Sequence, residues 1–192
     1  MTIMIIGLLI FLGSHSVRIF AENWRQQQIA KFGETTWKIA YSAVSVIGLA
    51  IAIYGFGQMR LDPIYVWQPP MGMRHAVALL MLPAFIMLVA AYVPHNAIKA
   101  KLGHPMMLSV KIWAFAHLLA NGRLGDIIFF AAFLIWAILA FKAAKKRGRL
   151  TPAAPVSTTK MATISTVLIG LVAYVVFAFY LHTALIGVPV FS

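Results

Sequence analysis

Long apolar stretches dominate this chain, and short polar or basic segments separate them. Six of these stretches reach, or come close to, the length of about 20 mostly apolar residues that a helix needs to cross a bilayer. They are Met1–Phe20, Trp37–Gln58, His75–Val93, Pro105–Ala120, Gly125–Phe141 and Met161–Gly187. None of them alternates polar and apolar residues with the period of two that membrane strands show. The pattern therefore predicts an all-α integral membrane helical bundle of about six transmembrane helices.

The composition agrees with a membrane protein and excludes several other classes. The chain is 62% hydrophobic and 10% charged, whereas a soluble domain is about 45–50% apolar and about 25% charged. It has no cysteine, which excludes a disulfide scaffold and any thiolate ligand or nucleophile. The net charge is +12, and the basic residues lie between the apolar stretches. We therefore expect membrane lipids as partners and no nucleic acid.

The basic residues are distributed unevenly between the connecting segments. Twelve of them lie at the ends of, or in the connections after, the first, third and fifth stretches, whereas the other connections hold only Arg60, Arg74 and Arg123. The positive-inside rule places the richer set in the cytoplasm. With six spans, both termini then lie outside, in an N-out/C-out topology.

The predicted bundle divides into three parts along the chain. Residues 1–142 form a five-helix membrane core, residues 143–160 a basic cytoplasmic linker, and residues 161–192 a sixth transmembrane helix with a short tail. The linker contains Pro152, Pro155 and a Ser/Thr cluster, a composition typical of flexible connections. We expect the sixth helix to be a loosely attached addition to the core.

Acidic residues are scarce, and their positions exclude several kinds of chemistry. The four are Glu22, Glu34, Asp62 and Asp126, and none lies in the interior of a predicted span. Proton pumps and cation-coupled carriers usually need a carboxylate there. Paired-carboxylate hydrolysis lacks its residues, and no G-x-S-x-G motif indicates a serine hydrolase.

Histidine is the residue type that offers chemistry. His15 and His117 lie several residues inside predicted spans, His75 and His182 near the outer boundary, and His95 and His104 near the inner one. Each imidazole can simply hydrogen-bond across a helix interface or meet water at the headgroups. Alternatively, two neutral imidazoles on separate helices suit axial ligation of haem iron inside a helix bundle. No H-E-x-x-H motif indicates a zinc protease.

The segment from His104 to Gly122 is the richest in polar and aromatic residues. Pro105 suits the first turn of a helix, and Asn121-Gly122 suits its end. Lys111 lies about 9 Å into this helix. Its side chain either extends to the headgroups or holds an anionic group such as a haem propionate.

The sequence resembles the NnrU family of bacterial membrane proteins along nearly its whole length. The resembling pieces are His15-Ser16-Val17-Arg18, Tyr41-Ser42, Trp67-Gln68-Pro69-Pro70, Ala90-Ala91-Tyr92-Val93-Pro94, the block from His104-Pro105 through Lys111-Ile112-Trp113-Ala114 to His117-Leu118-Leu119-Ala120-Asn121-Gly122, and His182 with Ile186-Gly187-Val188. The block around Lys111 and His117 is the most specific of these pieces. The resemblance implies the bacterial inner membrane and an association with denitrification and nitric oxide metabolism.

The family's plant relative, zeta-carotene isomerase, is a membrane haem b enzyme that converts a cis double bond to trans. Carried over by motif, this resemblance implies that His15 and His117 are axial ligands of haem b. Arg18 and Lys111 are candidate cofactor-binding residues, because haem propionates need Arg or Lys partners. His75, His104 and His182 are second candidates for the iron. The relative has a cysteine three residues before its second ligand, where this chain has Ala114, so its ligand switch does not carry over.

Three functions compete at this point. The first is a haem b protein with redox or isomerase chemistry on an apolar, polyene-like lipid. The second is a non-catalytic membrane partner that assists assembly of a respiratory or denitrification complex. The third is a small-molecule carrier, which the lack of internal repeats and of buried carboxylates disfavours.

Overall fold

The computed structural model describes residues 1–150 and 157–191, and within these ranges the chain is almost entirely helical. The helices are α1 (Thr2–Phe20), α2 (Glu22–Phe32), α3 (Glu34–Met59), α4 (Met73–Tyr92), α5 (Ala97–Leu102), α6 (Pro105–Ala120), α7 (Leu124–Leu150), α8 (Lys160–Val176), the π-helix η1 (Phe177–Leu181) and α9 (His182–Ile186). The described residues contain no strand, only an isolated β-bridge between Tyr65 and Arg123. The predicted all-α membrane bundle is confirmed.

Five helical segments in the described ranges are long and apolar enough to cross a membrane. They are α1, α3, α4, α7 and the continuous segment from α8 through α9. The sixth predicted span, α6, has the predicted bounds, but its 16 residues make it shorter than a usual span. A crossing by α6, and with it the count of six, stays a prediction.

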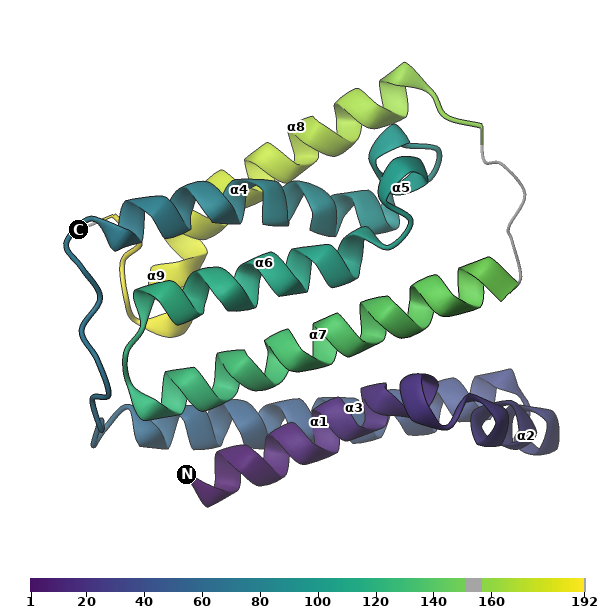
Figure 1. The fold of residues 1–192 in the computed structure, drawn as a ribbon, viewed down its shortest axis with the longest axis horizontal. Helices are drawn as coiled ribbons and strands as arrows, with labels where there is room; N and C mark the ends of the chain where they lie inside the picture. Colours follow the sequence, from purple (N-terminus) through teal and green to yellow (C-terminus); the bar gives the residue numbers. More distant parts are fainter. Residues whose placement is uncertain (151–156, 192) are drawn as a thin grey trace.

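Helix α7 lies at the centre of the bundle (Figure 1). It packs against α1 on one side and α6 on the other, and α3 and α4 pair closely with α1 and α6, respectively. Helix α8 covers α4. Three aromatic residues of α7, Phe129, Phe130 and Phe133, belong to the buried core where these helices meet.

The contact between α1 and α3 depends on small residues. A Cβ at Gly48 would lie 2.7 Å from the backbone nitrogen of Phe11. Gly7 and Gly55 lie equally tightly against the backbone of Ala52 and Met4. Within lipid, helices gain no hydrophobic free energy from pairing, so close backbone approach at small residues supplies the attraction.

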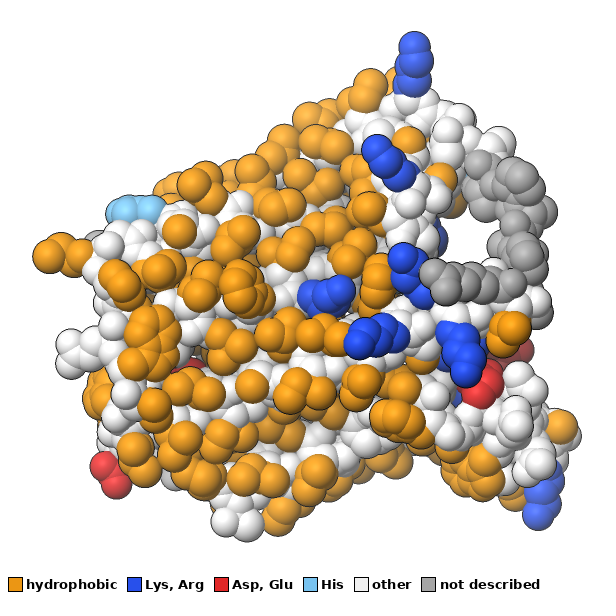
Figure 2. All heavy atoms as spheres, in the orientation of Figure 1, with side chains coloured by type: hydrophobic (Ala, Val, Ile, Leu, Met, Phe, Trp, Pro, Cys, Tyr) orange, Lys and Arg blue, Asp and Glu red, His pale blue; other side chains and the backbone are white. Residues whose placement is uncertain are grey.

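The basic residues gather at one end of the bundle. This end holds α2, α5 and the C-terminal end of α7, while the N-terminus and the end of α9 lie at the opposite end (Figure 1). On the face shown in Figure 2, Lys and Arg side chains concentrate toward the first end, and the rest of the surface is mostly apolar. The membrane side that each end faces stays a prediction.

The boundary between the predicted core and the predicted linker falls inside a helix. Helix α7 continues to Leu150, eight residues beyond the predicted core boundary at residue 142, so the first part of the predicted linker is helical. Alanine and lysine between Lys142 and Lys146 are good helix formers, which explains the extension. Pro152 and Pro155 lie outside the described residues.

Helix α8 is closely packed on α4, in contrast to the expected loose attachment. A Cβ at Gly170 would lie 2.8 Å from the Cα of Ile86. Phe85 of α4 also contacts Tyr174 and Phe177, with ring centroids 6.0 and 5.4 Å away. The C-terminal helical segment is therefore an integral layer of the bundle.

Candidate functional site

His15 lies where α1, α3 and α7 meet. Its Nδ1 lies 2.7 Å from the carbonyl oxygen of Phe11, one turn earlier on α1. Its ring lies 4.3 Å from the Phe11 ring, 5.1 Å from that of Tyr41 on α3 and 5.8 Å from that of Trp136 on α7, measured between centroids. Three helices therefore hold the imidazole in one orientation.

His117 lies on α6 and faces the same central helix. Its Nδ1 lies 2.8 Å from the carbonyl oxygen of Trp113, again one turn earlier on the same helix. Its ring lies 4.7 Å from that of Phe130 on α7 and 5.5 Å from that of Trp113. The Asn121 side chain donates to the His117 carbonyl oxygen at 2.8 Å and so secures the end of α6.

Both imidazoles carry their hydrogen-bonding proton on the same nitrogen. A carbonyl oxygen can only accept, so Nδ1 is the donor in His15 and in His117. Among the described residues, neither Nε2 has a hydrogen-bond partner. A neutral imidazole with its Nδ1–H bonded to a carbonyl and its Nε2 free is the form that ligates iron or another metal. The chemistry of the donor set therefore fits haem.

The structure brings both histidines to α7 without bringing their rings into contact. Their ring neighbours on α7, Trp136 and Phe130, are six residues apart, about 9 Å along the helix axis. A chain of ring contacts through Phe11, Phe133 and Trp113 connects the two imidazoles. The two candidate ligands thus border one aromatic cluster at different depths.

Trp136 is a member of this site that sequence reasoning missed. Its ring meets His15 nearly edge-on, and its Nε1 is buried with no hydrogen-bond partner among the described residues. A buried indole N–H usually has an acceptor, because leaving it unpaired costs about 1–3 kcal/mol. Within the described ranges, the Trp136 N–H is therefore an unpaired donor beside His15. A lone Trp between apolar residues was the available signal in the sequence.

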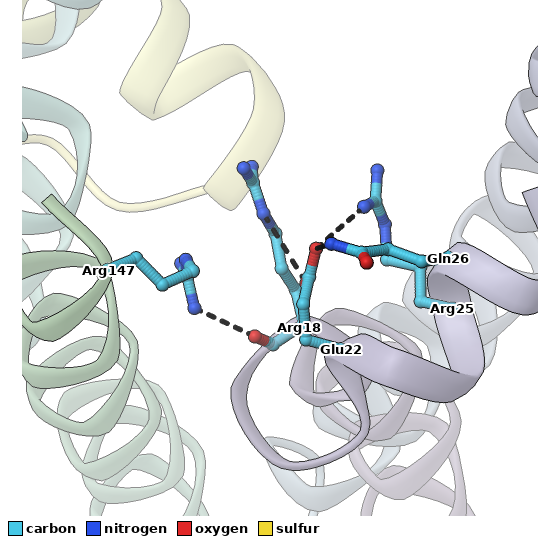
Figure 3. A network of polar contacts seen from close by, with 5 residues as sticks. All are labelled: Arg18, Glu22, Arg25, Gln26 and Arg147. Atoms are coloured by element: carbon cyan, nitrogen blue, oxygen red, sulfur yellow. Dashed lines mark hydrogen bonds and ion pairs between the residues drawn. The ribbon is translucent and has the colours of Figure 1, made fainter. Parts of the chain in front are cut away.

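The two predicted basic residues lie apart from the imidazoles. The Arg18 side chain is exposed and pairs with Glu22, with Nε 3.9 Å from the carboxylate (Figure 3). The Nζ of Lys111 lies 4.4 Å from the ring centroid of Phe141 on α7, toward the basic end. Neither contact is with His15 or His117. A propionate-binding role for either residue stays a prediction.

Of the second candidates for the iron, His75 and His104 lie apart from the two imidazoles, whereas His182 is close enough to His117 for a Coulombic interaction. His75 is exposed near the start of α4, and His104 precedes α6 with its ring edge-on to Phe141 at 6.2 Å. His182 follows the π-helix η1, and its Nδ1 lies 2.6 Å from the Val188 carbonyl oxygen. The described residues contain no group of three or more His, Asp or Glu side chains that could hold a metal ion.

Two of the sequence pieces that carry the resemblance meet in space. The backbone N–H groups of Val66 and Trp67 donate to the Gly122 carbonyl oxygen at 2.8 and 3.2 Å. The Trp67 carbonyl lies so close to the Gly122 Cα that a Cβ would overlap it. This contact joins the α3–α4 connection to the end of α6 and explains the need for glycine there.

Comparison with known proteins agrees with these features. The family model described as NnrU protein matches residues 3–190. No curated protein and no solved structure matches the chain. Because the matched region covers almost the entire chain, this protein belongs to the NnrU family.

Proposed function

We propose that this NnrU-family membrane protein binds haem b through His15 and His117 and uses it in redox or isomerase chemistry on an apolar, polyene-like lipid. The proposed location is the bacterial inner membrane, with a link to denitrification or nitric oxide metabolism. The observation that carries the proposal is that the two imidazoles share the same hydrogen-bonding pattern. Each donates through Nδ1 to a carbonyl on its own helix and leaves Nε2 free among the described residues.

The surroundings of the two histidines support a large, mostly apolar ligand. Phe130 and Trp113 contact the His117 ring, and Tyr41 and Trp136 contact the His15 ring. The free Trp136 N–H supplies one donor for a polar group of that ligand. These residues would orient the ligand and exclude water. When bound, haem would supply a redox-active iron next to the lipid phase.

The visible absorption spectrum of the detergent-purified protein tests this proposal. The wild type, produced in haem-replete cells, is expected to show a Soret band and sharp α and β bands after reduction. His15→Ala and His117→Ala are each expected to lose the haem, measured as the ratio of Soret absorbance to protein. A symmetric size-exclusion peak for both variants shows that the loss is not due to unfolding.

His95→Ala is the matched control. The His95 Nδ1 also meets a carbonyl oxygen, that of Ser157 at 3.0 Å, but this imidazole is exposed and lies at the basic end. We expect this variant to retain its haem. Haem retention by either the His15 or the His117 variant contradicts the assignment of two ligands. A colourless wild-type preparation contradicts haem binding altogether and favours the non-catalytic assembly partner.

A further inference from the structure

An apolar groove runs along the bundle surface between α1 and α7. Its volume is about 360 Å³, and its walls carry Ile5, Leu9 and Leu12 from α1 and Ile128, Ile135 and Leu139 from α7. Ser16 is its one polar lining residue, at the end of the groove nearest α2. The groove faces the space that lipid fills around the bundle, so an apolar chain is the occupant that its walls suit.

Two lysines extend the groove-lining row of α7 toward the basic end. The lining residues Ile128, Ala132, Ile135 and Leu139 follow alternating intervals of four and three, and Lys142 and Lys146 continue the same spacing. Residues at this spacing share one face of a helix. Both lysines are exposed. The groove therefore ends beside two positive charges.

The helix ends next to these lysines are linked and also carry excess positive charge. An Arg147 guanidinium nitrogen donates to the Arg18 carbonyl oxygen at 2.9 Å and joins the end of α7 to the end of α1 (Figure 3). Arg18 and Arg25 share the single carboxylate of Glu22, at 3.9 and 3.0 Å. Three guanidinium groups with one carboxylate leave a formal charge of +2 at this corner, so an anionic group is the complementary partner.

Measured from Lys142, the groove extends farther than one leaflet of a membrane. Each wall spans 11 residue steps, from Ile5 to Ser16 and from Ile128 to Leu139, which corresponds to about 16 Å of helix. Half of a hydrocarbon core of about 30 Å is about 15 Å. The groove stops three residues before Lys142, and its far end at Ile128 is 14 residues from Lys142, about 21 Å along the helix. A chain that enters from the basic end would therefore fill its own leaflet and pass the bilayer midplane.

From the apolar walls of the groove, its length and the positive charges beside its end, we propose that the groove binds one anionic phospholipid from the leaflet at the basic end. One acyl chain lies between α1 and α7, and the phosphate lies at Lys142 and Lys146. Charge complementarity selects an anionic headgroup over a zwitterionic one, and the depth of the groove selects an acyl chain over a short apolar molecule. This inference does not depend on the proposed haem site.

Quenching of Trp136 fluorescence by lipids brominated on their acyl chains tests the site, because Trp136 lines the groove. The full-length protein is reconstituted with brominated phosphatidylglycerol or brominated phosphatidylcholine at equal mole fractions. The Trp136 contribution is the difference between the wild type and Trp136→Phe. We expect stronger quenching of this contribution by brominated phosphatidylglycerol.

Charge variants show whether the two lysines create the preference. Lys142→Gln with Lys146→Gln is expected to reduce the relative affinity for phosphatidylglycerol by roughly fivefold for each lysine. Lys101→Gln with Lys145→Gln removes the same charge from the same end of the protein and is expected to retain the preference. Lys145 is the matched residue on α7, because its Nζ lies 5.4 Å from the Phe141 ring centroid instead of continuing the groove-lining row.

A filling variant tests the acyl chain separately. Gly13 lines the groove, and a Cβ there meets no atom within 4 Å, so Gly13→Phe fits the fold while occupying the groove. It is expected to weaken Trp136 quenching by both lipids. Equal quenching by the two lipids in the wild type, an equal loss in the control pair, or unchanged quenching in Gly13→Phe would overturn the proposal. So would a dimer that cross-links through Gly13→Cys while both lipids fail to quench Trp136.

Discussion

Two ion pairs of similar length in this chain differ strongly in burial. Arg123 Nε lies 2.6 Å from the Asp126 carboxylate, whose side chain is 3% exposed. Lys38 Nζ lies 2.8 Å from Glu34, with both side chains more than two-thirds exposed. Removing one partner of a buried pair leaves an uncompensated charge and costs about 3–5 kcal/mol, whereas water screens an exposed pair.

Arg123→Gln leaves the buried Asp126 carboxylate without its partner and is therefore expected to lower the thermal unfolding temperature in detergent by roughly 6 °C or more. Glu34→Gln is the matched control and is expected to unfold close to the wild-type temperature. Size-exclusion chromatography after heating measures the unfolding temperatures of both variants. Equal shifts in the two variants would contradict a stabilising role for the burial of Asp126.

The sequence identified candidate ligand residues by type and position but not their neighbours. His15 and His117 were selectable because an imidazole inside an apolar stretch needs a partner. The aromatic contacts to Trp136 and Phe130 depend on how each helix is rotated about its axis, which packing decides. For the same reason, the spacing of Lys111 could not predict its position over the Phe141 ring.

At the scale of elements, the contact between α4 and α8 is sensitive to residue size. Gly170 lies against the backbone of Ile86, so a larger side chain must push the helices apart. Gly170→Leu is expected to separate α8 from α4. The chain has no cysteine, so the introduced pair Phe85→Cys with Tyr174→Cys supplies the only thiols that a cross-linker can join. The two residues are in contact, so the pair reports on this helix contact.

A short bifunctional thiol reagent should cross-link the pair efficiently in the wild-type background and severalfold less in the Gly170→Leu background. Gly57→Leu, at a helical glycine where a Cβ meets no atom within 4 Å, is the control and should leave cross-linking unchanged. Unreduced cross-linking with Gly170→Leu would show that α8 does not depend on this close approach.

Apolar helices were predictable from sequence because lipid selects for length and hydrophobicity, and α6 has the predicted bounds. Helix α2 was not predicted, since it is polar and has no buried residue. Its stability comes from helix-forming residues such as glutamine and from Glu22 and Lys31 at the ends that the helix dipole favours. The extension of α7 to Leu150 was missed for the same reason.

For the whole molecule, the uneven charge predicts the orientation. The end with α2, α5 and the end of α7 is expected in the cytoplasm, with both termini outside. Reporter fusions after Ala153 and Ser192 measure this. Cytoplasmic activity at Ala153 and external activity at Ser192 are the expected pair, and the reverse pair would contradict the topology.

The shortness of α6 has a consequence for what closes the ends of the bundle. Its 16 residues rise about 24 Å, against a hydrocarbon core of about 30 Å. Helices α4 and α7 pack on both sides of it and are longer, with 20 and 27 residues, so the bilayer follows their length. If α6 crosses the membrane as predicted, a centred α6 leaves its ends, at His104 and Asn121, about 3 Å inside the membrane surfaces. At the Asn121 end the backbone N–H groups of Val66 and Trp67 donate to Gly122, and that of Leu124 donates to Ile64. The α3–α4 connection therefore closes the bundle at that end.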